Sequence, residues 1–265
     1  MTQPTMLTLT RHADGHVVEV TLDRPGAMNA ISTALAQEIT AVTGDLAADQ
    51  RVRAVVLTSS HERAFCVGAD LKERNGFTDL ELMEHRLVTR RAYRGVLDLP
   101  VPAIAAVEGF ALGGGMEIAL SCDLIIAGEE ATLGLPEVSV GVIPGGGGTQ
   151  LLTRRVGWSR AAQMIFTAQR YSAAEAKELG AVDELVPAGT ARDRALELAT
   201  LMAGHSPVGM RNAKAAMRMG MGTDLAAGLE IEDGAWRATA FSADRKEGVA
   251  AFAEKRRPNW PGGGA

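Results

Sequence analysis

Residues 111–120 read ALGGGMEIAL and combine two features that are unusual in a buried helix. Three glycines, Gly113 to Gly115, open the segment, although glycine in a helix interior costs about 1 kcal/mol relative to alanine. A single carboxylate, Glu117, follows in an apolar setting, where carboxylates are rarely buried unpaired. The stretch predicts a helix whose free N–H groups can hold an anion, or an oxygen that becomes negative in a reaction. Close packing of strand on helix is the competing interpretation, which the glycines alone favour.

The segments around this stretch predict an α/β fold. Apolar runs indicate buried strands on both sides of it, and strands and helices alternate through roughly the first two hundred residues. From about residue 190 only helices are expected, broken at two glycine-containing turns, so we expect a core over residues 1–203 and a helical region over residues 204–265. The expected elements are strands over residues 16–22, 53–59, 101–109, 122–128 and 181–186, helices from Ser32, over residues 79–99 and from about residue 149, and a long loop over residues 61–76.

The composition of the 265 residues argues against several classes of protein. The formal net charge is −5, whereas general nucleic-acid binding needs a broad basic surface. Cys66 and Cys122 form no C-x-x-C pair, and the five histidines are scattered, so neither a disulfide framework nor a metal site is expected. No apolar run is long enough for a membrane span, and the first residues lack the pattern of a signal peptide. We therefore expect a cytoplasmic protein with no membrane or nucleic-acid partner.

Residues 65–73, FCVGADLKE, form a second candidate segment. They follow an expected strand and place Gly68 at a turn. Taken alone, they are better explained as a surface loop in which Asp70 and Lys72 are solvated.

Residues 133–150, LGLPEVSVGVIPGGGGTQ, form a third. Glu137 follows Pro136, which predicts the first turn of a short helix. The glycines Gly145 to Gly148 lack the Gly-Lys-Ser/Thr of a phosphate loop and the G-x-G-x-x-G pattern. Taken alone, they indicate a flexible connection.

Together the segments point to one chemistry. Glu117 and Glu137 each lie in a glycine-rich, otherwise apolar setting, and two carboxylates near one water can act in turn as base and acid. A pair of backbone N–H groups can stabilise an oxyanion beside them. The absence of a G-x-S-x-G pattern argues against a serine hydrolase of the usual α/β type.

At this point the sequence resembles the enoyl-CoA hydratase/isomerase (crotonase) superfamily, and most of all an enoyl-CoA hydratase. The resemblance implies a spiral of repeated ββα units with a helical C-terminal region used in trimer formation. It covers nearly the whole chain through the motifs LDRPGAMNAI (residues 22–31), AFCVGADLKE (64–73), VPAIAAVEGFALGGGMEIALSCDLIIAGEEATLGLPE (101–137), GVIPGGGGTQLLTRRVG (141–157) and RKEGVAAFAEKRRP (245–258).

The resemblance also implies the site residues. Glu117 and Glu137 match the two catalytic glutamates, with Glu117 as the base for the water and Glu137 as the acid that delivers a proton to C2. The thioester carbonyl oxygen is expected between the N–H groups of Ala69 and Gly114. Coenzyme A belongs to the substrate, so no separate cofactor is expected.

Further positions match the family's CoA contacts. Those expected near the pyrophosphate and pantetheine are Arg24, Ala27 and Met28, and those around the adenine and the thioester are Ala69, Asp70, Leu71 and Lys72. Trp236 and Lys255 match positions that reach the CoA of a neighbouring subunit. A solvated helix end is the alternative explanation for Lys255 and the two arginines that follow it.

Hydration of a trans-2-enoyl-CoA to a 3-hydroxyacyl-CoA is therefore the predicted reaction, with a homotrimer or a hexamer as the predicted assembly. A Δ3,Δ2-enoyl-CoA isomerase or a hydratase for a branched, methylglutaconyl-like acyl group is the alternative within the family. A non-catalytic RNA-binding or scaffold protein on the same fold is the alternative outside it, which the acidic charge and the two glutamates count against. Acyl chain length and pathway, fatty-acid β-oxidation among them, stay open.

Overall fold

The computed structural model describes residues 6–262, which fold around two sheets. Most neighbouring strands run parallel, whereas β1 is antiparallel to β2 and β9 is antiparallel to β8. The large sheet has the order β1 (Leu7–His12), β2 (Val17–Leu22), β3 (Ala54–Ser59), β5 (Ala103–Val107), β7 (Leu124–Gly128) and β10 (Glu184–Val186). The small sheet has the order β4 (Ala64–Cys66), β6 (Phe110–Leu112), β8 (Thr132–Gly134) and β9 (Tyr171–Ser172).

Successive pairs of strands divide themselves between the two sheets. In the pairs β3–β4, β5–β6 and β7–β8, the first strand joins the large sheet and the second joins the small sheet, after which helices follow. These helices are α2 (Leu71–Arg74) and α3 (Asp79–Leu97) after β4, α4 (Gly114–Ser121) after β6, and the 3-10 helix η3 (Glu137–Val140) with α5 (Gly148–Val156) after β8. The expected spiral of repeated ββα units is confirmed.

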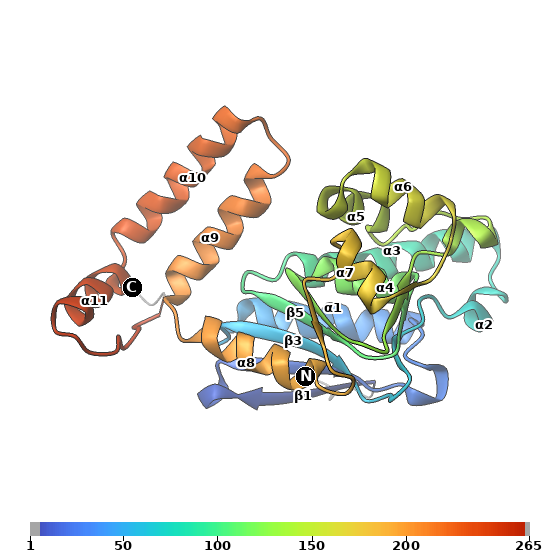
Figure 1. Ribbon diagram of the computed structural model, residues 1–265, viewed down its shortest axis with the longest axis horizontal. Coiled ribbons are helices and arrows are strands. Elements are labelled where there is room, and N and C mark those ends of the chain that lie inside the picture. Colours follow the sequence, from blue (N-terminus) through green and yellow to red (C-terminus); the bar gives the residue numbers. More distant parts are fainter. Residues whose placement is uncertain (1–5, 263–265) are drawn as a thin grey trace.

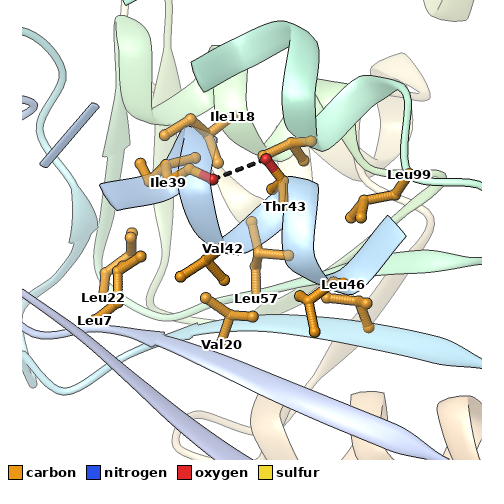
Figure 2. A pocket seen from close by; sticks show the side chains of 12 residues that line it. Leu7, Val20, Leu22, Ile39, Val42, Thr43, Leu46, Leu57, Leu99 and Ile118 are labelled. Carbon is orange, nitrogen blue, oxygen red and sulfur yellow. Dashed lines mark hydrogen bonds between the residues drawn. The ribbon is translucent and has the colours of Figure 1, made fainter. Parts of the chain in front are cut away.

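The core lies between the sheets and the helices that cover them. Ser32 caps α1 (Thr33–Ala48), as predicted, by accepting a hydrogen bond from the Leu35 N–H at 3.2 Å. Helix α1 packs with α3 in the main apolar cluster, while α8 (Ala191–Ala203) covers the large sheet through a second cluster. The main cluster contains a cavity of about 10 Å³, lined by apolar side chains and by Thr43, whose hydroxyl donates to the Ile39 carbonyl (Figure 2). This cavity has no room or polar partners for a ligand.

The last helices form an arm that projects from the core (Figure 1). It consists of α9 (Pro207–Gly220), α10 (Leu225–Ala240) and α11 (Ala243–Ala253). Lys214 and Arg218 tie α9 to the core through ion pairs of 2.6 and 2.9 Å with Asp123. The chain therefore leaves the sheet where α8 ends and enters the arm at α9, close to the expected boundary at residue 203; a division into two domains stays a prediction.

The short elements depart most from the sequence prediction. The expected loop over residues 61–76 contains β4 and α2, and β1, β6, β8 and β9 were not predicted. The expected strands over residues 122–128 and 181–186 start later, at Leu124 and Glu184, and the helix from residue 79 ends at Leu97. Strands of two or three residues carry too little periodicity to be recognised, which explains the omission of β4, β6, β8 and β9 but not that of β1, which has six residues. The remaining elements are η1 (Ala13–Gly15), η2 (Pro25–Ala27), α6 (Trp158–Phe166) and α7 (Ala173–Leu179).

Within residues 6–262, no helix has both the length and the apolar character needed to cross a bilayer.

Candidate active site

The candidate site forms where three neighbouring strands of the small sheet end. Because β4, β6 and β8 are adjacent and parallel, their carboxyl ends meet at one edge, and so do the segments that follow them. These segments carry Ala69, Glu117 and Glu137. The topology thus brings together the three motifs that the sequence singled out separately.

The first two segments touch at Gly68. Its φ angle is +92°, and a Cβ there would lie 2.8 Å from the Leu112 carbonyl oxygen and 3.0 Å from the Gly114 nitrogen. Only glycine fits this left-handed, crowded position. The contact places the peptide of Ala69 beside the first residue of α4.

The N–H groups of Ala69 and Gly114 are both available. Throughout residues 6–262, neither has a hydrogen-bond acceptor, although the adjacent Asp70 N–H donates to Ile31 at 3.1 Å and Gly113 donates to Gly134 at 2.8 Å. Gly114 begins α4, so its N–H also lies at the positive end of the helix. The pair is suited to hold an oxygen that gains negative charge.

Glu117 is buried, with 3% of its surface exposed, and is held by the glycine-rich segment. The N–H groups of Gly146 and Gly148 donate to its Oε1 at 2.6 and 2.9 Å. Burial raises the pKa of Glu117, and these N–H groups oppose that rise by stabilising the carboxylate. The interpretation of Gly145–Gly148 as a flexible connection is therefore wrong, because the segment is a cradle for Glu117.

Arg86 on α3 braces this cradle. Its guanidinium donates to the Gly145 carbonyl, which belongs to the same peptide group as the Gly146 N–H. Its positive charge also acts to lower the pKa of Glu117. Arg86 thus supports the ionised form of Glu117 without contacting the carboxylate.

Glu137 occupies the first turn of η3, after Pro136, as predicted. A Cβ at Gly113 would lie 3.0 Å from Glu137 Oε1, which places this carboxyl group over the start of α4. Its Oε2 is buried and makes no hydrogen bond within the described residues. Burial, followed by the charge of Glu117, raises the pKa of Glu137 to about 7. The two glutamates therefore belong to one electrostatic unit.

The three glycines that open α4 serve both purposes considered at the outset. A Cβ at Gly115 would overlap the Cys66 carbonyl, so this glycine permits close packing of the helix on β4. A Cβ at Gly114 would overlap the hydroxyl of Tyr93, a buried side chain of α3. The packing interpretation is thus confirmed at Gly115, and the site interpretation at Gly114 stays a prediction.

Most candidate CoA contacts lie together near Ala69. Arg24 pairs with Asp70 at 2.8 Å, and Asp70 in turn caps α2 by accepting the N–H groups of Lys72 and Glu73. Burial acts to raise the pKa of Asp70, but Arg24 and these N–H groups outweigh it and lower the pKa. The Met28 carbonyl accepts the Val67 N–H at 3.3 Å, so the segment with Ala27 and Met28 lies beside the same loop. Leu71 and Lys72 are exposed.

Trp236 and Lys255 lie elsewhere. Trp236 is 65% exposed on α10, and Lys255 follows α11, so both belong to the projecting arm and not to the neighbourhood of α4 in the same chain (Figure 1).

Sequence reasoning missed four side chains around the site: Arg74, His85, Arg86 and Tyr93. Three of them lie on α3, where His85, Thr89, Ala92, Tyr93 and Val96 form the buried stripe. The available signal was a histidine and a tyrosine at apolar positions of an amphipathic helix, since buried polar groups need partners.

Comparisons with known proteins find a family model, relatives and solved structures that are similar to this chain. The family model for enoyl-CoA hydratase/isomerase matches residues 12–263. The short-chain-enoyl-CoA hydratase of Clostridium acetobutylicum is 39% identical over 92% of this chain and 94% of its own, and the methylglutaconyl-CoA hydratase of Mus musculus is 39% identical over 93% and 80%. The crystal structure of an enoyl-CoA hydratase from Bacillus anthracis superposes with a TM-score of 0.93 at 41% identity, covering 97% of this chain and 99% of that one.

Proposed function

The chain belongs to the enoyl-CoA hydratase/isomerase family, and from that membership we propose that it adds water across the C2=C3 bond of a trans-2-enoyl-CoA to give a 3-hydroxyacyl-CoA. The observation that carries the proposal is the contrast between two neighbouring glutamates. Glu117 is fixed by two N–H donors, whereas Glu137 has a buried oxygen without a hydrogen-bond partner in the described part of the chain and a pKa raised to about 7.

The oxyanion hole starts the reaction. The thioester carbonyl, conjugated to the double bond, makes C3 electrophilic, and attack by water sends charge to the carbonyl oxygen as an enolate. The N–H groups of Ala69 and Gly114 stabilise that charge. Removing one such donor from other enzymes costs about 3–4 kcal/mol of transition-state stabilisation.

The two carboxyl groups then divide the proton transfers. Glu117 accepts N–H bonds from Gly146 and Gly148, which favour its ionised form, so it acts as the base that takes a proton from the water. The pKa of Glu137, raised by burial and then by Glu117, keeps much of it protonated near neutral pH, so it delivers a proton to C2. Proton exchange then restores both groups.

Coenzyme A is proposed to lie along the Arg24–Met28 and Ala69–Lys72 segments, with no separate cofactor. The arm is proposed to mediate a homotrimer or a dimer of trimers, in which Trp236 and Lys255 approach the CoA of a neighbouring subunit. The proposed assembly is supported by a groove of about 730 Å³ between α9 and α10 and by a set of exposed apolar side chains on the arm. These are Met217, Met219, Met221, Leu225, Leu229, Trp236, Phe241, Val249 and Phe252.

A hydration assay tests the function. Purified protein is mixed with trans-2-butenoyl-CoA, and the loss of absorbance of the conjugated thioester is followed. Glu117→Gln and Glu137→Gln are each expected to lower kcat by ~10³-fold, the scale of general acid–base catalysis. Glu130→Gln is the matched control, because Glu130 is an exposed glutamate between the other two in the sequence. Near-normal hydration by either site variant would refute the two-carboxylate mechanism.

The same assay separates the alternatives. Turnover of 3-enoyl-CoA without hydration of any 2-enoyl-CoA would identify an isomerase. RNA binding that falls with salt, with no turnover of any enoyl-CoA, would identify a non-catalytic protein on this fold. The names of the relatives do not choose the acyl group, since short-chain and methylglutaconyl-CoA hydratases share the same 39% identity with this chain.

A further inference from the structure

Arg74, the last residue of α2, is a half-buried cation that forms no ion pair with the other residues that the structure describes. Its Nε atom is buried, and among residues 6–262 no hydrogen bond or ion pair reaches its guanidinium. The Nε–H of Arg74 is thus a buried donor without an acceptor among these residues, and such a group costs free energy unless a partner completes it. Arg74 lies five residues after Ala69, and its backbone N–H donates to the Asp70 carbonyl at 3.0 Å, so α2 follows directly on the segment proposed to hold the thioester.

His85 of α3 is the second incomplete group. It is 5% exposed, and neither ring nitrogen has a hydrogen-bond partner within the described chain. The nearest carboxylate oxygen, Glu73 Oε2, is 3.9 Å from His85 Nε2 and already accepts the Thr33 N–H at 2.9 Å. The Phe77 ring, 5.2 Å away between centroids, covers the imidazole. His85 is therefore a second buried polar group without a hydrogen-bond partner in the described chain.

The charge of Arg74 links His85 electrostatically to the proposed acid, Glu137. The charge of Arg74 acts on the His85 ring and also lowers the pKa of Glu137, against the rise caused by burial and by Glu117. It also acts on Tyr93, which contacts Gly114. Together with the unpartnered Oε2 of Glu137, the site thus holds three incomplete polar groups. A plain hydrocarbon chain would leave all of them unsatisfied.

We propose that Arg74, assisted by His85, binds a carboxylate on the acyl group, so that the substrates are short trans-2-enoyl-CoA thioesters with a terminal carboxylate. The inference rests on the proposed function and specifies its substrate class. Arginine has only donors, in a planar fork that matches a carboxylate. Burial, the larger effect, and the charge of Arg74 both lower the pKa of His85, so the imidazole stays neutral and donates one N–H to the same carboxylate. The single positive charge of Arg74 then balances the single negative charge of the acyl carboxylate.

The decisive experiment compares two substrates of equal length. Glutaconyl-CoA carries a carboxylate at C5, where trans-2-pentenoyl-CoA carries a methyl group. We expect a kcat/KM at least ~10-fold higher for glutaconyl-CoA, and a fall in the ratio of the two values by ~30-fold in Arg74→Met, the scale of a hydrogen bond to a charged group. His85→Leu is expected to reduce the ratio less, and Arg74→Lys is expected to retain part of it. Because each variant is judged by a ratio, a general loss of folded enzyme cancels.

Arg90→Met is the matched control, since Arg90 is an exposed cation of α3 one turn beyond Arg86. It should leave the ratio unchanged. An equal loss on both substrates in Arg74→Met would overturn the proposal, because it would assign Arg74 to the CoA moiety or to the fold. A wild-type preference for pentenoyl-CoA would overturn it as well.

A binding measurement separates this inference from the proposed function. Glutaryl-CoA ends in a carboxylate like glutaconyl-CoA, and valeryl-CoA ends in a methyl group like pentenoyl-CoA, but neither has a double bond. Calorimetry therefore measures their affinities without turnover. Tighter binding of glutaryl-CoA that is lost in Arg74→Met would support the carboxylate site even if neither enoyl-CoA were hydrated. Equal affinities would refute it even if both were hydrated.

Discussion

Glu117 on α4 and Glu137 on η3 are residues of the same type in two different environments. Glu117 is 3% exposed, yet its Oε1 receives two backbone N–H groups from Gly146 and Gly148. Glu137 is less buried but has no donor for its Oε2 within the described residues, and its pKa rises to about 7. The supply of hydrogen-bond donors, more than the depth of burial, separates the group suited to act as a base from the group suited to act as an acid.

The difference originates in a segment that contains no titratable residue. Gly145–Gly148 carries no charge, yet it positions the N–H groups that favour ionised Glu117, and Arg86 holds the segment from α3. Glycine is required there because Gly146 sits against Glu117 Oε2 and the Tyr93 ring. The chemistry of the carboxylates is thus set by backbone geometry.

The largest expected effect separates the two roles by reaction type. Hydration needs both groups, whereas moving a proton between C2 and C4 of a 3-enoyl-CoA needs one. Glu117→Gln should therefore lower hydration by ~10³-fold while retaining far more of any isomerisation, and Glu137→Gln should lower both. Parallel assays of 2-enoyl-CoA hydration and 3-enoyl-CoA isomerisation give the two rates. Equal losses of both activities in Glu117→Gln would contradict the division of roles.

Gly146→Ala should have the next largest effect. A Cβ there would lie 2.7 Å from Glu117 Oε2 and 2.7 Å from the Tyr93 ring, so the cradle must shift. We expect kcat to fall by ~10²-fold, comparable to the loss of one well-placed hydrogen-bond donor. Gly145→Ala is the matched control, because a Cβ at that position makes only ordinary contacts, at 3.5 Å or more. Similar losses in both variants would show that the segment matters for folding and not for Glu117.

Arg86→Met should shift the pH dependence of the reaction. Removing its charge and its bond to Gly145 raises the pKa of Glu117 further, so the base is ionised only at higher pH. The acidic limb of the kcat profile should therefore move to higher pH, with kcat near neutrality reduced by about 10-fold. Arg90→Met serves again as the control on α3. A uniform fall in kcat without movement of the acidic limb would rule out an electrostatic role for Arg86.

Much of the fold and the centre of the site could be predicted from the sequence. The apolar runs of β3, β5 and β7 are long enough to be recognised, and the cap at Ser32 follows a local rule. Glu117 and Glu137 are conspicuous because each is a carboxylate in an apolar, glycine-rich segment. These features depend on neighbours in the sequence.

The features that escaped prediction depend on tertiary contacts. The strands β4, β6 and β8 are three residues long and exist because they pair with one another. Arg74 is ordinary in sequence, and His85 is marked only as a histidine at an apolar position of an amphipathic helix. That Arg74 Nε and both His85 ring nitrogens have no partner among the described residues is seen only in the fold. Likewise, nothing in a run of four glycines indicates which N–H groups reach Glu117.

The smallest expected effect concerns stability. Folding raises the pKa of Glu137 from an ordinary 4.5 to about 7, because of burial and then of Glu117, so the folded chain keeps a proton that the unfolded chain releases over this range. Wild-type stability should therefore decline between pH 4.5 and 7 relative to Glu137→Gln, which carries no titratable group there. Thermal unfolding gives the Tm of the variant minus the Tm of the wild type at each pH. This difference should be a few degrees larger at pH 8 than at pH 5. The amide still buries a polar group, but that cost is equal at both pH values and cancels in the comparison. The exposed Glu130→Gln should show no such dependence, and a Tm difference for Glu137→Gln that is identical at both pH values would contradict a raised pKa in the folded state.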